Sequence, residues 1–556
     1  MRTLGDERPT SDAAVELPVV VELHPILAGR ADEPGESEFP EAVRDAVAHE
    51  VSALLSALGI PGRPAVRVEP RAEAAGRAHR LLRLTVGDRV ARFPEDVVRA
   101  TYRARQRAAE APTWVEILMQ LRAAETPSVA AFLADVCREA IVRRPQVLLA
   151  RAQLEAYRDG APTLAELRWG RDIDVLERIL MRVLSLGISL GDRAGVARVL
   201  GSESVERWED VAEDLVSALR EPAIVVQMAP EYLRELTERF TDAGGPDSIS
   251  DTRQELFTEL GVPLPAFRFE PAPRFAAGSF AFRINALSTQ PIVGVPADHV
   301  FVNEQADVLR SRDIDAEPMP YPMSDSQGSI VHATSRERVE STGARWWSPV
   351  AYLAGCLTQT VRSDVGRVLE QGTVARQLRD LATWNVIPAL SDVDAPEMAP
   401  RALTPVLRAL VDERVSVRNL PLIYGRLLER AAGVETDGEL PGRLAFVRAQ
   451  LASQIANRSA SGAAYVAAYL MSEDFETALS APRTVDGDDA LLDAIHAEFD
   501  RLGTVTTKPA LLTEGAHREA LAALVASELP QVSVLSYEEI PPAMNVQPIG
   551  RITIDA

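Results

Sequence analysis

The sequence predicts an α+β protein of several domains in which one structural unit occurs twice and a mixed α/β unit follows. Two observations predict this class. The chain has 556 residues, 46% of them hydrophobic and 25% charged, which is typical of a globular chain with roughly three or four domains. Strand-like and helix-like patterns also alternate along it, and several segments of the first half recur in the same order in the second half.

The N-terminal segments are read from hydrophobic periodicity. Residues 1–16 are polar without a period and are expected to form a disordered tail. The β-branched run at 17–25 predicts a strand, and apolar residues at helical spacing over 40–58 predict a helix that Gly59 ends.

The next segments continue the same analysis. Alternating apolar residues predict half-buried strands at 65–70 and 81–86, and a helical pattern extends from about 97 to 220. Near the C-terminus, strands are expected at 508–512 and 532–536, on either side of a helix at 515–527.

The second half repeats the first at an offset that rises from about 200 residues to 227, as insertions into the second copy would produce. The alternative is that helix–strand–strand patterns recur by chance. The matching segments are 17–25 with 222–230, 51–70 with 253–271, 82–84 with 282–284, 130–134 with 350–354, and Ile188, Leu190, Asp192, Val196 and Leu200 with Val415, Val417, Asn419, Ile423 and Leu427.

Composition excludes several classes of function. The net charge of -22 argues against nucleic acid or an anionic membrane as the partner. Lys508 is the only lysine and lies in no phosphate-binding loop. The N-terminal segment has no apolar signal region, and no run reaches the roughly 18 apolar residues of a membrane span. The sequence therefore predicts a cytoplasmic protein without direct membrane insertion.

No catalytic, metal or cofactor site is predicted. The seven histidines include no pair at H-x-x-x-H spacing, and the sequence contains no G-x-S-x-G. Cys137 and Cys356 lie in apolar helical patterns and are expected to be buried. The acidic stretch 485–489 is interpreted as a solvated turn, not a calcium loop, and Arg83 as part of a solvated helix face. An enzyme with scattered carboxylates remains an alternative.

One local feature favours a protein-binding surface. Large aromatic and methionine side chains, which often anchor interfaces, gather around a Pro/Ser-rich connection although only 5% of the chain is aromatic. The alternative is that the two tryptophans close a subdomain core. The candidate residues are Met319, Tyr321, Met323, Trp346, Trp347 and Tyr352.

Several motifs of the second half resemble one family. They are Glu-Leu-Gly-Val-Pro-Leu-Pro-Ala-Phe-Arg-Phe (259–269), Phe-Arg-Ile (282–284), Ala-Glu-Pro-Met-Pro-Tyr-Pro (316–322), the stretch Val-Leu-Arg-Ala-Leu-Val-Asp-Glu-Arg-Val-Ser-Val-Arg-Asn-Leu (406–420), and Leu-Pro-Gln-Val-Ser-Val-Leu-Ser-Tyr-Glu-Glu-Ile-Pro (529–541). From about residue 222 to 556 the chain resembles the cytoplasmic part of the FHIPEP family, the export-gate proteins of flagella and type III secretion systems. At the family's Thr-His pair this chain has Ala351 and Tyr352.

The resemblance implies an architecture of ferredoxin-like α/β subdomains, helical subdomains and a C-terminal α/β wedge. The expected units are a tail (1–16), a first-copy ferredoxin-like α/β unit (17–96), a first-copy helical region (97–220), second-copy α/β subdomains (221–349), a second-copy helical subdomain (350–435) and the wedge (436–556). Family members form nine-membered rings, which implies a homo-oligomer as one arrangement of this chain.

The resemblance and the missing catalytic motifs together predict a non-enzymatic scaffold or adaptor that binds proteins through the cleft between subdomains of its second copy. One alternative is an accessory component of an export apparatus that docks chaperone-bound cargo or a membrane gate protein. Another is a scaffold in a signalling or defence system.

Overall fold

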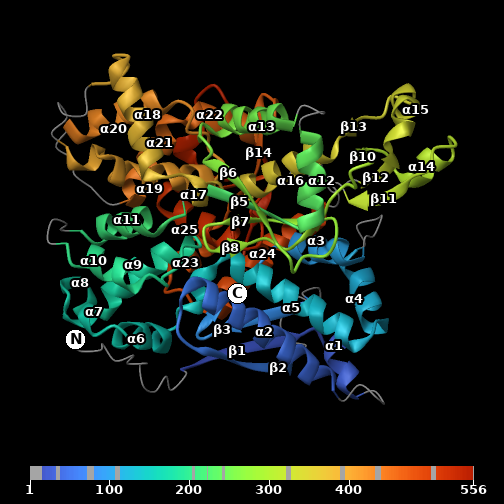
Figure 1. The fold of residues 1–556 in the computed structure, drawn as a ribbon. Coiled ribbons are helices and arrows are strands. Elements are labelled where there is room, and N and C mark those ends of the chain that lie inside the picture. The colour runs from blue at the N-terminus through green and yellow to red at the C-terminus, as the bar shows by residue number, and fades with distance from the viewer. Residues whose placement is uncertain are drawn as a thin grey trace, which may run out of the picture.

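The computed structural model describes residues 15–32, 38–71, 81–106, 113–202, 207–221, 223–240, 245–320, 327–388, 395–432, 440–502 and 509–554. In these ranges the chain is a mixed α/β protein with four small sheets surrounded by helices (Figure 1). Within the same ranges, no helix is both long and apolar enough to cross a membrane. The expected tail lies almost wholly outside the described residues.

The N-terminal sheet has the strand order β2–β1–β3–β4. Its strands are β1 (Glu16–Leu23), β2 (Arg63–Pro70), β3 (Leu82–Val86) and β4 (Arg89–Val90). β1 is parallel to β2 and antiparallel to β3. Leu17, Val19, Val21 and Leu23 of β1 are fully buried, because alternate side chains of a strand face the same side.

Helix α2 (Phe39–Leu58) connects β1 to β2 and packs against β2 and α5. Its buried stripe repeats at helical spacing, as expected from the sequence. The helix ends at Gly59, which confirms the predicted end. Gly59 has a φ of 68°, which glycine adopts easily because it has no Cβ.

The remaining helices of the N-terminal half share one hydrophobic core with this sheet and fill the lower part of Figure 1. They are α1 (Pro25–Ala28), α3 (Glu95–Gln106), α4 (Trp114–Ala123), α5 (Thr126–Arg143), α6 (Arg151–Asp159), α7 (Pro162–Glu166), α8 (Arg168–Arg171), α9 (Ile173–Ser185), α10 (Arg193–Leu200) and α11 (Trp208–Leu219).

A second sheet has the order β6–β5–β7–β8, and β9 also pairs with β7. β5 is parallel to β6 and antiparallel to β7, so the pairing directions match those of the N-terminal sheet. The elements are β5 (Ala223–Met228), α12 (Pro230–Phe240), α13 (Gly245–Leu260), β6 (Ala266–Pro271), β7 (Ser279–Ile284), β8 (Leu287–Ser288) and β9 (Ile292–Val293).

The predicted ferredoxin-like strand order is not found in either sheet. A split βαβ arrangement leaves another strand between the two strands that the helix joins. Here β1 pairs directly with β2, and β5 pairs directly with β6. Parallel strands need such a helical crossover, but the crossover is compatible with either arrangement. Hydrophobic periodicity finds the strands but does not determine which of them become neighbours.

A matching backbone contact follows the helix in each half. The amide of Leu190 donates to the carbonyl oxygen of Leu58 (2.8 Å), and the amide of Val417 donates to that of Leu260 (2.9 Å). Gly261 ends α13 with a φ of 77°, as predicted, and a Cβ there would lie 2.2 Å from a backbone nitrogen. The two halves therefore share strand order, pairing directions and this close helix-to-loop contact.

A third sheet, in the order β11–β12–β10–β13, lies with two short helices at the upper right of Figure 1. Its elements are β10 (His299–Val302), α14 (Ala306–Arg310), β11 (Glu317–Pro320), β12 (Gln327–His332), α15 (Arg336–Ser341) and β13 (Trp346–Trp347). The helices that follow are α16 (Pro349–Ser363), α17 (Val365–Val368), α18 (Gln371–Thr383), α19 (Pro400–Asp412) and α20 (Leu420–Ala432).

The C-terminal unit contains a parallel sheet in the order β16–β15–β14–β17. Val534 and Leu535 are 7% and 1% exposed, so their predicted place in this core is confirmed. Lys508 lies outside the described residues. The elements are α21 (Leu440–Gln450), α22 (Ala452–Ser459), β14 (Tyr465–Met471), α23 (Glu473–Ser480), α24 (Val485–Leu502), β15 (Ala510–Thr513), α25 (Gly515–Val525), β16 (Val534–Ser536) and β17 (Asn545–Ile552).

The two halves interlock at the β7–β8 turn. The Asn285 side-chain amide donates to the carbonyl oxygen of Leu186 (2.8 Å), and the amide of Ala286 donates to that of Gly187 (2.9 Å). Leu287 belongs to the hydrophobic core of the N-terminal half. A turn of the second sheet thus completes the core of the first half.

Candidate functional site

Two of the predicted aromatic residues, Trp347 and Tyr352, meet around Phe301, where the β10–β13 sheet joins α16. The Phe301 ring centroid lies 5.8 Å from that of Trp347 and 5.1 Å from that of Tyr352. The Tyr352 hydroxyl donates to the carbonyl oxygen of Pro320 (3.2 Å). Burial raises the pKa of Tyr352, with a further contribution from Cys356. Tyr352 is therefore a neutral, hydrogen-bonded core residue at physiological pH.

Exposure separates the predicted residues into two groups. Met319 and Tyr352 are 6% and 4% exposed, whereas Trp346 and Trp347 are half-buried. The Trp346 indole donates to Glu340 (2.8 Å), and consecutive strand residues face opposite sides, so the two tryptophans point to different faces of β13. Tyr321 and Met323 lie outside the described residues. Protein binding by this cluster stays a prediction.

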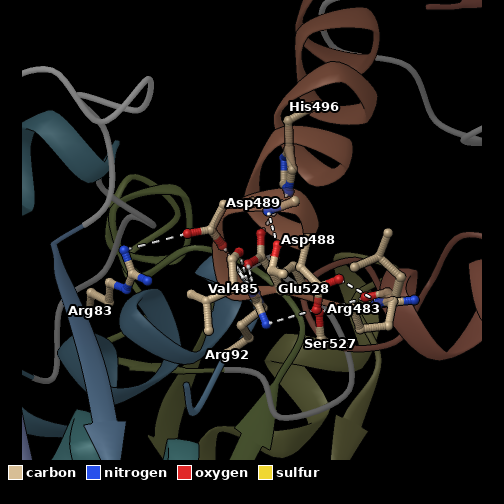
Figure 2. Close-up of polar contacts among 12 residues, drawn as sticks. Arg83, Arg92, Arg483, Val485, Asp488, Asp489, His496, Ser527 and Glu528 are labelled. Atoms are coloured by element: carbon tan, nitrogen blue, oxygen red, sulfur yellow. Dashed lines mark hydrogen bonds and ion pairs between the residues drawn. The ribbon is translucent and has the colours of Figure 1, made fainter. Parts of the chain in front are cut away.

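A second cluster, which we call the Arg92 hub, joins the N-terminal sheet to the C-terminal unit (Figure 2). Arg92 is 9% exposed and donates to Asp489 (2.8 Å), Asp488 (3.4 Å) and the carbonyl oxygen of Val485 (3.1 Å). Arg83 of β3 also approaches Asp489, at 3.5 Å. One arginine thus spans the first turn of α24 with charge-assisted hydrogen bonds, which are stronger than neutral ones.

The Arg92 hub corrects two sequence interpretations. Residues 485–489 begin α24 and are not a solvated turn, because carboxylates are favourable at the positive N-terminal end of a helix. Arg83 lies on β3, within the strand predicted at 81–86, and pairs with Glu22 and Asp489, so its interpretation as part of a solvated helix face is wrong. The partners are about 400 residues apart in sequence, so no local pattern could reveal them.

A buried ion pair forms another junction, between α11 and α19. Glu213 and Arg408 are 2% and 1% exposed, and one guanidinium nitrogen lies 2.8 and 2.5 Å from the two carboxylate oxygens. Arg408 also donates to the carbonyl oxygen of Leu369 (3.0 Å). Burial lowers the pKa of Arg408 and the charge of Glu213 opposes this. Arg182 also donates to Glu213 (3.4 Å), so Glu213 has two arginine partners. The Arg408 charge depends on Glu213, because burial keeps it from water.

A cleft of about 630 Å³ lies elsewhere, at the junction of the helical and C-terminal units. Its walls come from the end of α13, the α19–α20 connection, α22, α25 and the segment 530–535. Arg414, Arg418, Arg448 and Arg458 line it. The sequence analysis expected a cleft between subdomains of the second half but named none of these lining residues, which are spread over about 280 positions.

Among the described residues, one group of side chains has the spacing of metal ligands. Glu476, Glu514 and His517 place one ligand atom each within 4.8 Å of the others. Protein groups already satisfy part of this cluster, since Thr513 donates to Glu476 (2.5 Å) and His517 contacts Ser480 (3.0 Å). Cys137 and Cys356 are free and buried, as predicted, and burial raises the pKa of the Cys137 thiol to about 12.

The amino-acid sequence of this chain is similar to one protein family and to several of its members. The FHIPEP family model matches residues 193–545. The low calcium response locus protein D of Yersinia pestis is 22% identical over 332 residues, and the flagellar biosynthesis protein FlhA of Treponema pallidum is 25% identical over 327. Each match covers 55% of this chain and 44% of the relative, so the chain spans less than half the length of either.

Among solved structures, the CdsV protein of Chlamydia pneumoniae has a similar fold. The TM-score is 0.51 and the sequence identity 21%, and the match covers 60% of this chain and 98% of the CdsV chain. This similarity concerns the fold alone. The N-terminal sheet and most of the helices that pack with it lie outside the family match.

Proposed function

This chain belongs to the FHIPEP family, and on that premise we propose that it is a cytoplasmic, non-enzymatic scaffold or adaptor that binds other proteins. The observation that carries the proposal is the way the N-terminal half is attached. Nearly buried Arg92 joins it to the C-terminal unit of the family region, and buried Arg408 of α19 binds Glu213 of α11, the helix that leads from the N-terminal half into the second sheet. These contacts hold the N-terminal half against the family region, and such an arrangement suits a scaffold.

We further propose that the N-terminal half is a shortened copy of the family unit. The matching strand order, pairing directions and helix-to-loop contact support this. A second copy within one chain would resemble a covalent dimer, and it could replace or cap a ring of identical chains. Light scattering on the purified chain distinguishes these arrangements: a monomer supports the capping role and a ring of nine refutes it.

The partner surface that we propose lies at β13, where Trp346 and Trp347 remain partly exposed on opposite faces of the strand. Met319 and Tyr352 would support this surface from the core. Aromatic residues with one exposed edge are common interface anchors. The related flagellar biosynthesis protein favours export as the setting, with chaperone-bound cargo or a membrane gate protein as the partner.

The test measures binding of the intact chain to chaperone–cargo complexes from its own host by biolayer interferometry. Trp347→Ala is expected to weaken binding at least tenfold, because truncation of an anchor costs more than about 1.4 kcal/mol. Trp384→Ala is the matched control, since Trp384 is 71% exposed and lies on α18's C-terminal end. If Trp347→Ala lowers the melting temperature by several degrees and leaves affinity unchanged, the residue serves only the core.

A further inference from the structure

The 630 Å³ cleft has the dimensions of a small-molecule site and is separate from the aromatic cluster. Ligand pockets usually measure about 300–1,000 Å³ and lie where structural units meet. Here the α19–α20 connection forms one wall and α22 another, while the segment 530–535 of the C-terminal unit closes the side. Hydroxyl and amide groups of Ser416, Asn419 and Gln454 add polar groups to the lining.

The carboxylates of the cleft are already engaged by protein groups. Glu413 pairs with Arg448 (2.6 Å) and Arg518 (2.5 Å). Glu259 pairs with Arg362 (2.7 Å), outside the cleft lining. Asp412 accepts a hydrogen bond from the backbone amide of Gly366 (3.1 Å). Arg448 is likewise compensated, because it also binds Glu539 (2.6 Å).

The charges of three other arginines in the cleft are not paired with a carboxylate of any described residue. Within the described ranges, Arg414, Arg418 and Arg458 form neither an ion pair nor a side-chain hydrogen bond. All three are exposed to solvent and therefore accessible to a ligand. Partial burial lowers the pKa of the Arg458 guanidinium, the nearby charge of Arg414 lowers it further, and the charge of Glu259 opposes both. The cleft thus carries local positive charge in a protein whose net charge is -22.

The position of Arg418 is the most informative. It lies two residues before α20, which has no acidic residue in its first turn. The N-terminal end of a helix carries partial positive charge, so a cation there is unfavourable and an anion is favourable. Arg458 lies in the last turn of α22, where its charge also offsets helix carbonyl groups. Arg418 has no such internal compensation.

We propose that this cleft binds a small organic polyanion with at least two phosphate or carboxylate groups. One anionic group would lie between Arg418 and the N-terminal end of α20, and a second would reach Arg414 or Arg458. The guanidinium fork matches both carboxylate and phosphate oxygens in two parallel hydrogen bonds. A single inorganic phosphate would leave most of the volume empty, so the volume favours a larger ligand.

The experiment is isothermal titration calorimetry on the full chain at pH 7 and low salt, with inorganic pyrophosphate and citrate as probes. We expect binding of at least one probe to the unmodified chain and weakening of about tenfold or more in Arg418→Ala and Arg458→Ala, since each loses a charge-assisted hydrogen bond. Arg418→Gln keeps the length of the side chain and is expected to weaken binding similarly. The two probes distinguish a phosphate-bearing from a carboxylate-bearing ligand.

Arg376→Ala is the matched control, because Arg376 is an exposed arginine of α18 outside the cleft and its loss changes the net charge equally. This variant is expected to bind like the unmodified chain. An equal loss in all variants would show that only the overall charge matters and would overturn the proposal. The proposal is also overturned if neither probe binds at millimolar concentration. It is overturned as well if only an acidic peptide binds in an Arg418-dependent manner, because the cleft would then be a protein-docking site.

Discussion

The Glu213–Arg408 pair is expected to be a main determinant of how the two halves stay attached. Glu213→Gln leaves the Arg408 guanidinium, 1% exposed, with the carbonyl oxygen of Leu369 as its principal remaining partner. Two unit charges about 4 Å apart attract by about 4 kcal/mol at an effective dielectric constant of 20. Breaking a buried pair by removing one partner typically costs about 3–5 kcal/mol, because the other charge stays desolvated.

The assay is native-state hydrogen exchange, because a chain with several units does not unfold in one step. A loss of about 3 kcal/mol should accelerate exchange of the protected amides in α11 and α19 by about a hundredfold or more. The double substitution Glu213→Leu with Arg408→Met is expected to restore most of the protection, because an apolar pair needs no solvation.

The control is Arg426→Gln, which breaks an exposed pair with Glu429 within α20. Exposed pairs at this spacing contribute about 0.3–0.5 kcal/mol. If Glu213→Gln accelerates exchange no more than Arg426→Gln does, the buried pair contributes little to attachment. The reasoning from burial would then be wrong.

Three further predictions follow from single contacts. Arg92→Ala should accelerate exchange in the first turns of α24, whereas Arg99→Ala, which removes an exposed helical pair, should not. Gly261→Ala should lower the free energy of unfolding by more than about 1 kcal/mol, because a Cβ at a φ of 77° would clash with the backbone. Gly278 has a similar φ but open space around it, so Gly278→Ala should lower the stability less when both variants are compared by thermal unfolding. Since burial raises the pKa of Cys137 to about 12, its thiolate fraction at pH 8 is about one in ten thousand. Aromatic disulfide reagents should modify it only after unfolding, and rapid labelling of the native chain would contradict this.

Local patterns predicted those features that depend on local physics. The ends of two helices at Gly59 and Gly261 follow from glycine's access to positive φ. The burial of both cysteines follows from their apolar helical surroundings. The aromatic cluster was found as a sequence neighbourhood, but burial of Met319 and Tyr352 depends on how the β10–β13 sheet meets α16. Periodicity reports that a face is apolar and does not say what covers it.

The sequence by itself determined the family and located individual features such as the helix ends at Gly59 and Gly261 and the buried strand with Val534 and Leu535, because these depend on residue patterns along the chain. Only the tertiary structure decided which strands are neighbours, that Arg92 meets Asp488 and Asp489, and that Arg414, Arg418 and Arg458 line one cleft. The physical reason is separation in sequence. Long-range ion pairs and clefts form from residues that chain folding brings together, and a charged residue has the same appearance in the sequence whether it is solvated, paired or available to a ligand.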